Sequence, residues 1–330
     1  MATEPGGTRA AGAHAQPVNI ALAGEGAIAQ QHMEALSHLP GVKVVVLTGG
    51  VADDTRAFAA RWAIADWSLS LADALVRPDV DAVVLATPSG LHAAQAQACL
   101  AADKHVLIEI PMALNLTQAE HLADSAARSQ RVAMVAHTRR FNPPHRELRR
   151  QITSGVFHLQ HLVSETYFFR RSNENAAGQP RSWTDDLLWH HACHSVDLAM
   201  WLLDDPDMQV WAHHGPLSPT LGIPMDLSIG MRSPRHGGAL VTLALSFNNR
   251  GPFGGFYRYI GEEETYRAHR DELLDSRGQV VATEGASGIT RQDAEFIAAI
   301  RESRMPESSV AACLPAMRLL DRIEKAMHAH

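Results

Sequence analysis

Three side chains between residues 190 and 197 have the types and spacing of an acid–base site. His190, His194 and Asp197 are four and three residues apart, which places them on one face of an α-helix, whereas His191 points about 100° away. His194 is the best candidate for a general base, because a neutral imidazole with a pKa of about 6.5 accepts a proton near neutral pH. His190 would be its neighbour or a substrate contact. Asp197 would fix the tautomer, or raise the basicity, of a histidine that it reaches.

Two other interpretations of this cluster stay open. The same residues can form a hydrogen-bonded packing cluster, and histidines at positions i and i+4 also have a metal-ligand spacing. Because the sequence identifies no third ligand, we expect no metal. The cysteines at 99, 193 and 313 are too far apart in the sequence for a CxxC site or a disulfide framework, which fits a reducing cytosol.

A glycine-rich loop near the amino terminus has the pattern of a dinucleotide site. The apolar run 18–23 is followed by the sequence GEGAIA at 24–29 and then by a helical pattern. The first glycine permits a tight turn, and the second lets the backbone approach a pyrophosphate at the helix N-terminus. We expect the phosphates to lie against Gly24, Gly26, Ala27 and Ile28.

The end of the next apolar run, 42–47, bears on the choice between NAD and NADP. A carboxylate is expected there to bind a free ribose 2′-hydroxyl, but this sequence has Thr48, Gly49 and Gly50. The missing acid favours NADP, with NAD still possible. The Thr48 hydroxyl, the N–H groups of the two glycines and the Arg56 side chain would receive the 2′-phosphate. No basic residue stands in the turn itself, so we expect a mild preference.

Apolar runs and helical patterns alternate from residue 18 to about 137. The apolar runs are 18–23, 42–47, 82–86, 105–108 and 132–136, and the helical stretches are 28–37, 55–62, 91–102 and 118–129. Continuous apolar strands between helices predict a parallel sheet that is covered on both faces. We therefore expect an α/β fold with a doubly wound Rossmann domain over 18–140, after a disordered tail at 1–17.

The pattern changes after Pro143 and Pro144. Apolar and polar residues tend to alternate in three later runs, 162–169, 225–231 and 239–247, which predicts a mostly antiparallel sheet. One sheet face would pack on helices, including 186–203. The other face would join the subunits of a homodimer or homotetramer. Residues 141–330 would form this α+β domain for substrate binding and oligomerisation, with closing helices at 290–302 and 309–327, the last packing back on the first domain.

Composition excludes several classes of protein. With 330 residues the chain is long enough for two domains, and 46% apolar with 20% charged residues is typical of a globular protein. A net charge of −7, from 29 basic and 36 acidic residues, argues against a general nucleic-acid binder. No apolar run approaches the roughly 20 residues of a membrane-spanning helix. We expect a cytoplasmic protein whose partner is a small molecule.

Two further motifs carry a family resemblance. Residues 87–92 read TPSGLH and residues 104–111 read KHVLIEIP. With the glycine-rich loop they resemble the Gfo/Idh/MocA family (glucose–fructose oxidoreductase and inositol dehydrogenase), whose pattern is TPxxxH followed by GKHVxxEKP. The resemblance covers roughly residues 18 to 325. It implies a two-domain dehydrogenase that transfers a hydride from a CH–OH group, with Thr87, Pro88, His92 and Glu109 around the dinucleotide and nicotinamide.

The sequence departs from that pattern at one position. The family's catalytic lysine, in the middle of EKP, is Ile110 here, so either the chemistry needs no lysine or catalysis is lost. Motifs at 137–143, 167–171, 180–185, 188–197 and 245–249 resemble a branch of the family that also carries EIP and oxidises a dicarboxylated cyclic hemiacetal. A hemiacetal hydroxyl is more acidic than a sugar hydroxyl, so a neutral imidazole suffices as the base. Ile110 would then pack beside the nicotinamide.

Such a substrate implies guanidinium donors for its carboxylates. Arginines occur in these motifs as the pairs 139–140 and 170–171 and singly at 181. Neighbouring residues on a strand point to opposite faces, so at most one arginine of each pair enters the site. We favour Arg139, Arg170 and Arg181, with supporting contacts from Asn142, Tyr167, Trp183 and His191. Any one of these arginines can instead be a surface or interface residue.

Two alternative functions remain. A sugar or inositol dehydrogenase of the same family would be expected to have lysine at 110 and fewer arginines near the site. A catalytically silent dinucleotide-binding sensor agrees with the loss of the lysine, but not with the intact histidines.

Overall fold

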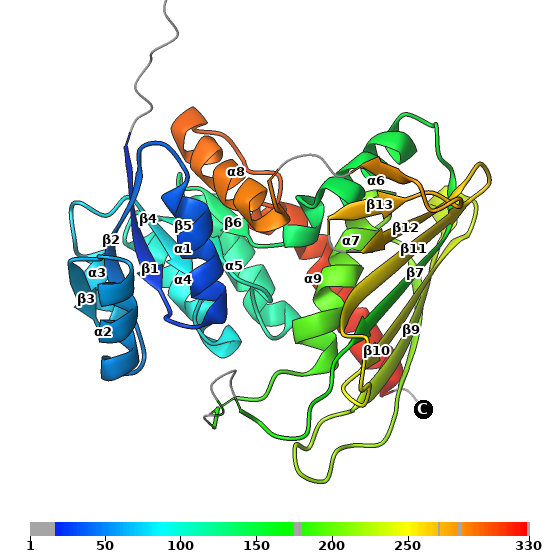
Figure 1. The fold of residues 1–330 in the computed structure, drawn as a ribbon, viewed down its shortest axis with the longest axis horizontal. Helices are drawn as coiled ribbons and strands as arrows, with labels where there is room; N and C mark the ends of the chain where they lie inside the picture. The colour runs from blue at the N-terminus through cyan, green and yellow to red at the C-terminus, as the bar shows by residue number, and fades with distance from the viewer. Residues whose placement is uncertain are drawn as a thin grey trace, which may run out of the picture.

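A computed structural model describes residues 17–174, 178, 180–181, 183–269, 271–282 and 286–328. Within them the chain forms two sheets, with helices packed between and around them (Figure 1). The expected tail lies outside the described residues except for Pro17.

The first sheet is parallel and has the strand order β3-β2-β1-β4-β5-β6. Its strands are β1 (Val18–Ala23), β2 (Val42–Thr48), β3 (Asp66–Ser68), β4 (Ala82–Leu85), β5 (His105–Ile108) and β6 (Ala133–Val135). The connecting helices are α1 (Ala27–Ser37), α2 (Ala52–Arg61), α3 (Leu71–Leu75), α4 (His92–Ala101) and α5 (Leu116–Arg128). The predicted doubly wound sheet is confirmed, and β3 with α3 are additions that the apolar pattern did not indicate.

The strand order reverses between β1 and β4, which is where a doubly wound sheet opens a crevice for a ligand. The loops after these strands touch there: a Cβ added to Gly24 would lie 2.2 Å from the carbonyl oxygen of Ala86 and 3.3 Å from the nitrogen of Thr87. The glycine-rich loop and the TPSGLH motif are therefore neighbours.

The second sheet has the order β14-β13-β12-β11-β7-β10-β9-β8. Its strands are β7 (Leu159–Tyr167), β8 (Gln209–His214), β9 (Asp226–Ser233), β10 (Ala239–Ser246), β11 (Gly254–Gly261), β12 (Thr265–His269), β13 (Glu272–Leu274) and β14 (Val280–Ala282). Only β7 and β10 pair in parallel, so the predicted mostly antiparallel sheet is confirmed.

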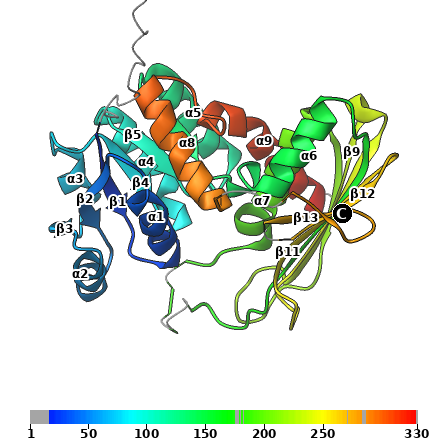
Figure 2. The same cartoon turned by 45° about the horizontal axis from the view of Figure 1, so that its top comes forward.

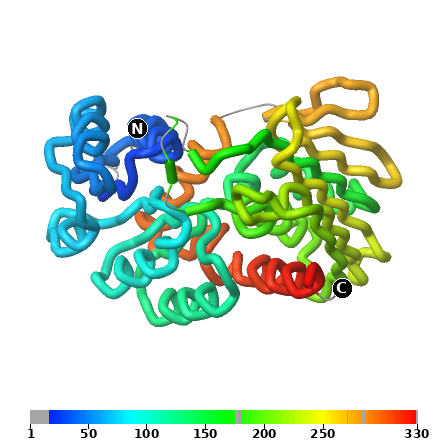
Figure 3. Tube along the Cα trace, turned by 90° about the horizontal axis from the view of Figure 1, so that it is seen from below, coloured from blue at the N-terminus to red at the C-terminus, as the bar shows by residue number. Residues whose placement is uncertain are grey.

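One face of the second sheet packs on helices α6 (Pro143–Thr153) and α7 (Cys193–Leu203) (Figure 3). Ser164 on β7 shares a 2.9 Å hydrogen bond with Ser195 on α7. Side chains alternate between the two faces of a strand, so those an odd number of positions from Ser164, such as Val163 and Tyr167, belong to the opposite face. We call this the outer face.

The last two helices return to the first sheet. Helix α8 (Gly288–Glu302) lies against α1, and α9 (Val310–Met327) packs against both α5 and α7, between the two sheets (Figure 2). Phe296 and Ile297 of α8 join the apolar cluster around Ile20 and Leu22 of β1. Among the described residues, no helix is long and apolar enough to cross a membrane.

Candidate active site

The glycine-rich loop fits the pyrophosphate of a dinucleotide. Gly24 has a φ of 115° and leaves no room for a Cβ, so only glycine fits this turn. Gly26 is the N-cap of α1, and a Cβ there would meet nothing within 4 Å. No protein neighbour therefore demands a glycine at 26, and the open space lies at the N-terminus of α1, next to Ala27 and Ile28, where phosphate binding is favourable.

The turn after β2 differs from the sequence-based expectation. The N–H groups of Gly50 and Val51 donate to Oε1 of Glu25, at 2.9 and 3.1 Å, and the N–H of Gly49 donates to the carbonyl of Ser68 at 3.0 Å. The expected backbone donors for a 2′-phosphate are therefore already used. Thr48 is buried, and its carbonyl accepts from the N–H of Gly24 at 2.7 Å.

Glu109, which follows β5, is held by a histidine that the sequence analysis missed. Nε2 of His32 lies 3.0 Å from Glu109 Oε1, while its Nδ1 lies 2.8 Å from Asp293 Oδ2 on α8. Burial acts to lower the pKa of His32, but the two carboxylates outweigh it and raise the pKa to about 10. His32 is therefore an imidazolium that orients Glu109. The second Glu109 oxygen accepts from the N–H of Ile110 at 3.1 Å.

This imidazolium predicts a stability change above neutral pH. A folded-state pKa of about 10 against an ordinary 6.5 means that the stabilisation is complete below pH 6.5 and is lost as the pH rises toward 10. We expect the free energy of unfolding, from urea denaturation, to fall by about 3 kcal/mol between pH 6.5 and 9. In His32→Gln most of that fall should vanish. An equal fall in both proteins would contradict the assignment.

His92 joins two loops rather than offering a nitrogen atom to the dinucleotide. Its Nδ1 lies 2.8 Å from the Pro111 carbonyl and its Nε2 lies 2.8 Å from the Thr87 carbonyl. Burial lowers the pKa of this imidazole. The ring fixes the turn at Thr87 and Pro88 against the strand end that carries Ile110, and its expected place around the dinucleotide stays a prediction. Ile110 itself packs against the apolar core, and its expected position beside the nicotinamide stays a prediction.

His194 stands on α7 as a neutral imidazole. Burial, and after it the positive charge of Arg139, hold its pKa well below the ordinary value. Its Nδ1 is buried and has no hydrogen-bond partner among the described residues. The ring is therefore unprotonated at neutral pH, which a proton acceptor requires.

The histidine that Asp197 reaches is His137, which lies outside the 190–197 segment. The two carboxylate oxygens of Asp197 accept from Arg140, at 2.8 Å from Nε and 2.6 Å from Nη2, and Oδ2 lies 3.4 Å from Nδ1 of His137. Arg140 and His137 hold the pKa of Asp197 below its ordinary value although burial acts to raise it. This fully buried ion pair ties α7 to the turn that follows β6.

The side chains of His137, Asp197 and Cys313 place three possible metal-ligand atoms within 4.8 Å of one another. The chemistry of the set does not suit a cation. The guanidinium of Arg140 already occupies both Asp197 oxygens, and burial raises the pKa of Cys313 to about 12, so its thiol stays protonated.

His190 has a set of partners different from that of His194. The N–H of Asp186 donates to Nδ1 at 3.0 Å, so the ring proton is on Nε2, which lies 2.7 Å from Ser89 Oγ and 3.3 Å from Asp185 Oδ1. Residues Leu187–Ala192 are π-helical, so the assumed 100° per residue does not hold there. His190 connects the TPSGLH motif to the second sheet's helices, a contact that sequence spacing did not reveal.

The two arginines of the first pair have separate environments. Arg139 donates from Nε to the Tyr257 hydroxyl at 3.1 Å, and its charge acts on His194. Arg140 is bound by Asp197, as described above. Residues Thr138–Arg140 form a 3₁₀ turn rather than a strand, so the reason given for their opposite directions is wrong, although Arg139 is the member of the pair whose charge lowers the pKa of His194.

Arg170 and Arg181 meet at Asp185, in the segment before the π-helical turn. Nη1 of Arg170 donates to the Asp185 carbonyl at 2.9 Å, and Nη1 of Arg181 donates to its Oδ2 at 2.7 Å. Arg181 also lies over the Trp183 ring, and its Nε is buried without a partner among the described residues. Because Asp185 also contacts His190, these residues form one cluster.

The remaining expected contacts are divided between several places. Tyr167 lies on the outer face, where it helps to line a shallow depression, so its expected substrate contact is wrong. His191 packs between Phe168 and Phe247, and burial lowers its pKa to about 4. The buried amide oxygen of Asn142, the N-cap of α6, has no partner among the described residues.

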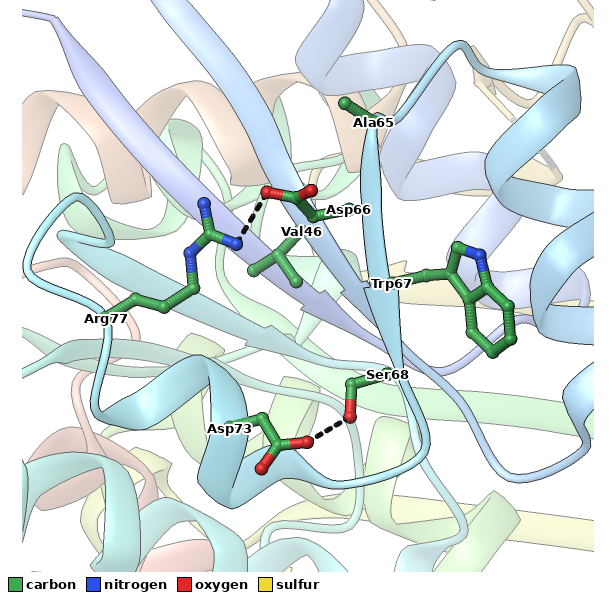
Figure 4. Close-up of a pocket in the computed structure, with 7 residues that line it drawn as sticks. All are labelled: Val46, Ala65, Asp66, Trp67, Ser68, Asp73 and Arg77. Atoms are coloured by element: carbon green, nitrogen blue, oxygen red, sulfur yellow. Dashed lines mark hydrogen bonds and ion pairs between the residues drawn. The ribbon is translucent and has the colours of Figure 1, made fainter.

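A separate hollow lies at the β3 edge of the first sheet, two strands away from β1. It is lined by Val46, Ala65, Asp66, Trp67, Ser68, Asp73 and Arg77 (Figure 4). Its charged groups satisfy one another, since Arg77 contacts Asp66 at 2.7 Å and Ser68 bonds to Asp73. This hollow contains none of the candidate catalytic residues.

Comparisons with known proteins agree with this geometry. The family "Oxidoreductase family, NAD-binding Rossmann fold" matches residues 18–137, and "Bacterial oxidoreductases, C-terminal" matches residues 143–286. The chain is 45% identical to a 4-carboxy-2-hydroxymuconate-6-semialdehyde dehydrogenase from Sphingobium sp. strain SYK-6, over 93% of this chain and 98% of that protein. It is 32% identical to an inositol 2-dehydrogenase of Mycolicibacterium smegmatis, over 57% of this chain and 53% of that one.

Solved structures share the fold over nearly the whole chain. A levoglucosan dehydrogenase in complex with NADH superposes with a TM-score of 0.83 at 21% identity, covering 95% of this chain and 97% of that one. An Agrobacterium radiobacter oxidoreductase in complex with NAD⁺, L-tartaric acid and magnesium gives 0.81 at 16% identity, with the same coverage. The chain belongs to the Gfo/Idh/MocA family of oxidoreductases, whose Rossmann domain binds a nicotinamide dinucleotide.

Proposed function

We propose that the protein oxidises 4-carboxy-2-hydroxymuconate-6-semialdehyde, as its cyclic hemiacetal, to 2-pyrone-4,6-dicarboxylate in protocatechuate catabolism. The observation that carries the proposal is a neutral imidazole beside an arginine, His194 and Arg139, in a chain that has Ile110 where the family has its lysine. The identity to a relative of that name over nearly its full length supports it. A sugar dehydrogenase would need a stronger base, because a sugar hydroxyl is less acidic than a hemiacetal hydroxyl.

His194 supplies the acid–base step. The imidazole accepts the hemiacetal O–H proton while the ring C–H bond breaks and the C=O bond of the lactone forms. The nicotinamide dinucleotide, held at the phosphate loop by Gly24 and Gly26, would supply the hydride acceptor. Glu109 is expected near the nicotinamide. His32 keeps it in a single orientation, because one ring nitrogen of His32 bonds the Glu109 carboxylate and the other bonds Asp293.

Arginines are proposed to bind the two carboxylates. Arg139 has the position to hold one of them near His194, and the Arg170–Arg181 cluster is the candidate for the other. Buried polar atoms of His194 and Arg181 have no hydrogen-bond partner among the described residues. Unpaired buried polar groups are costly, so a ligand that pairs with them gains affinity.

The test is a coupled assay. Protocatechuate is opened by a 4,5-dioxygenase in the presence of this protein and either NAD⁺ or NADP⁺, and absorbance at 340 nm is followed. We expect a rise matched by an equimolar amount of 2-pyrone-4,6-dicarboxylate, and no rise with the His194→Ala variant. A flat trace, with dinucleotide binding shown separately, would refute this substrate and favour a sugar dehydrogenase or a silent sensor. Assays with inositol and sugars then distinguish these two, because only the dehydrogenase would oxidise one of them.

The outer face is proposed to join subunits in a homodimer or homotetramer. Val163, Tyr167, Phe256 and Ile260 line its depression, and the neighbouring Leu240 is 39% exposed. Extended apolar sheet surface is rarely left in water. We expect light scattering to give a multiple of the single-chain mass and Val163→Arg to give a single chain, because a charge buried between two apolar faces is costly. A monomeric wild type would contradict the proposal.

A further inference from the structure

We propose that Glu25, the residue between the two glycines of the phosphate loop, makes this protein prefer NAD over NADP. The inference concerns the dinucleotide alone, which the family establishes. Its test is therefore independent of the substrate proposed above.

The Glu25 side chain crosses from the loop after β1 to the turn after β2. Its Oε1 accepts from the N–H groups of Gly50 and Val51, at 2.9 and 3.1 Å, immediately before α2 begins at Ala52. This turn is where a Rossmann fold meets the adenosine ribose. The carboxylate that the sequence lacks at the end of β2 is thus supplied by a residue about 25 positions earlier.

The second carboxylate oxygen is free to bind a hydroxyl. Oε2 of Glu25 takes no hydrogen bond from the described residues and lies beside Gly49, where an added Cβ would be 2.8 Å from it. A ribose 2′-hydroxyl is a donor and satisfies such an oxygen. A 2′-phosphate has only acceptors and carries about −1.5 to −2 charge, so the same oxygen repels it.

The described groups around this turn do not balance the negative charge of a 2′-phosphate. The N–H of Gly49 is bonded to Ser68, and Arg56 contacts Asp53 at 3.2 Å and lies over the Trp67 ring. Asp53 and Asp54, in the first turn of α2, add two further negative charges. Of the four groups that the sequence analysis assigned to the phosphate, the two glycine N–H groups and Arg56 therefore already have partners, and the surrounding charge is negative.

The experiment measures binding rather than turnover. Dissociation constants of NADH and NADPH are determined by isothermal titration calorimetry on the full chain, without substrate. We expect NADH to bind the wild type at least about tenfold more tightly than NADPH, and Glu25→Gln to reduce that ratio about tenfold. Glutamine keeps an oxygen that accepts from Gly50 and Val51, so the turn is preserved while the charge is removed.

Two variants serve as controls. Asp54→Asn removes one negative charge from the exposed first turn of α2 and should change the ratio less than about twofold. Glu25→Asp keeps the charge and should retain a preference for NADH. Tighter binding of NADPH by the wild type would overturn the proposal. So would a ratio that Glu25→Gln leaves unchanged, or one that Asp54→Asn lowers just as much.

Discussion

Replacement of His194 by alanine should lower kcat by about 10²- to 10⁴-fold, the usual contribution of a general base. His194 is the neutral imidazole beside Arg139, and no lysine at 110 is present to replace it. Affinity for NADH should stay within about twofold, because the phosphate loop lies on the first sheet. Steady-state kinetics in the coupled assay, with calorimetric titration of NADH, give both quantities.

The pH dependence of the rate makes this prediction specific. Because burial and the charge of Arg139 lower the pKa of His194 well below 6.5, kcat should not fall between pH 8 and 6. Removing that charge in Arg139→Met should raise the pKa of His194, so that the rate falls at a higher pH than in the wild type. Exposed His38, changed to alanine, is the control and should alter neither. Near-normal turnover in His194→Ala would refute the assignment.

The second large effect concerns stability. Asp197→Asn and Arg140→Met should each lower the free energy of unfolding by about 3–5 kcal/mol, the usual cost of leaving one partner of a buried ion pair unpaired. Both side chains are buried, and Arg140 contacts both carboxylate oxygens of Asp197. Urea denaturation followed by circular dichroism measures the change.

A matched surface pair provides the comparison. Arg146 contacts Glu307 at 2.8 Å, with about 40% of each side chain exposed, and Arg146→Met should cost no more than about 1 kcal/mol. Since Asp197 does not contact His194, Asp197→Asn should keep kcat within about tenfold at temperatures where it stays folded. A variant with normal stability and a rate as low as that of His194→Ala would show instead that Asp197 is part of the acid–base chemistry.

The sequence predicted the elements whose signal is local. Strands β1 and β5 begin and end where their apolar runs do, and the glycine-rich loop stands where its spacing indicates. Strand β3 was missed because Asp66, Trp67 and Ser68 form a short, mostly polar segment at a sheet edge, which has no continuous apolar run. Strands β13 and β14 were missed for a different reason: they are mostly apolar, but three residues are too few to show an alternating pattern.

The site was less accessible to sequence reasoning because its decisive contacts are tertiary. His32 and Asp293 are 261 positions apart, and Ser89 and His190 are 101 apart. Helical spacing suggested that Asp197 serves a neighbouring histidine, whereas the carboxylate turns to Arg140 in another segment. Glu25 was visible in the motif, but only the folded loop shows that it reaches Gly50.

The return of α8 to the first sheet bears on how the protein is made. Phe296 and Ile297 complete the apolar cluster around β1, and Asp293 completes the charge pairing of His32. These residues leave the ribosome about 150 positions after the last strand of that sheet. Domains usually fold in order during synthesis. Here the first sheet keeps part of its apolar surface exposed until α8 has been synthesised. A ribosome that stalls before α8 would hold a nascent chain that offers chaperones an exposed apolar face.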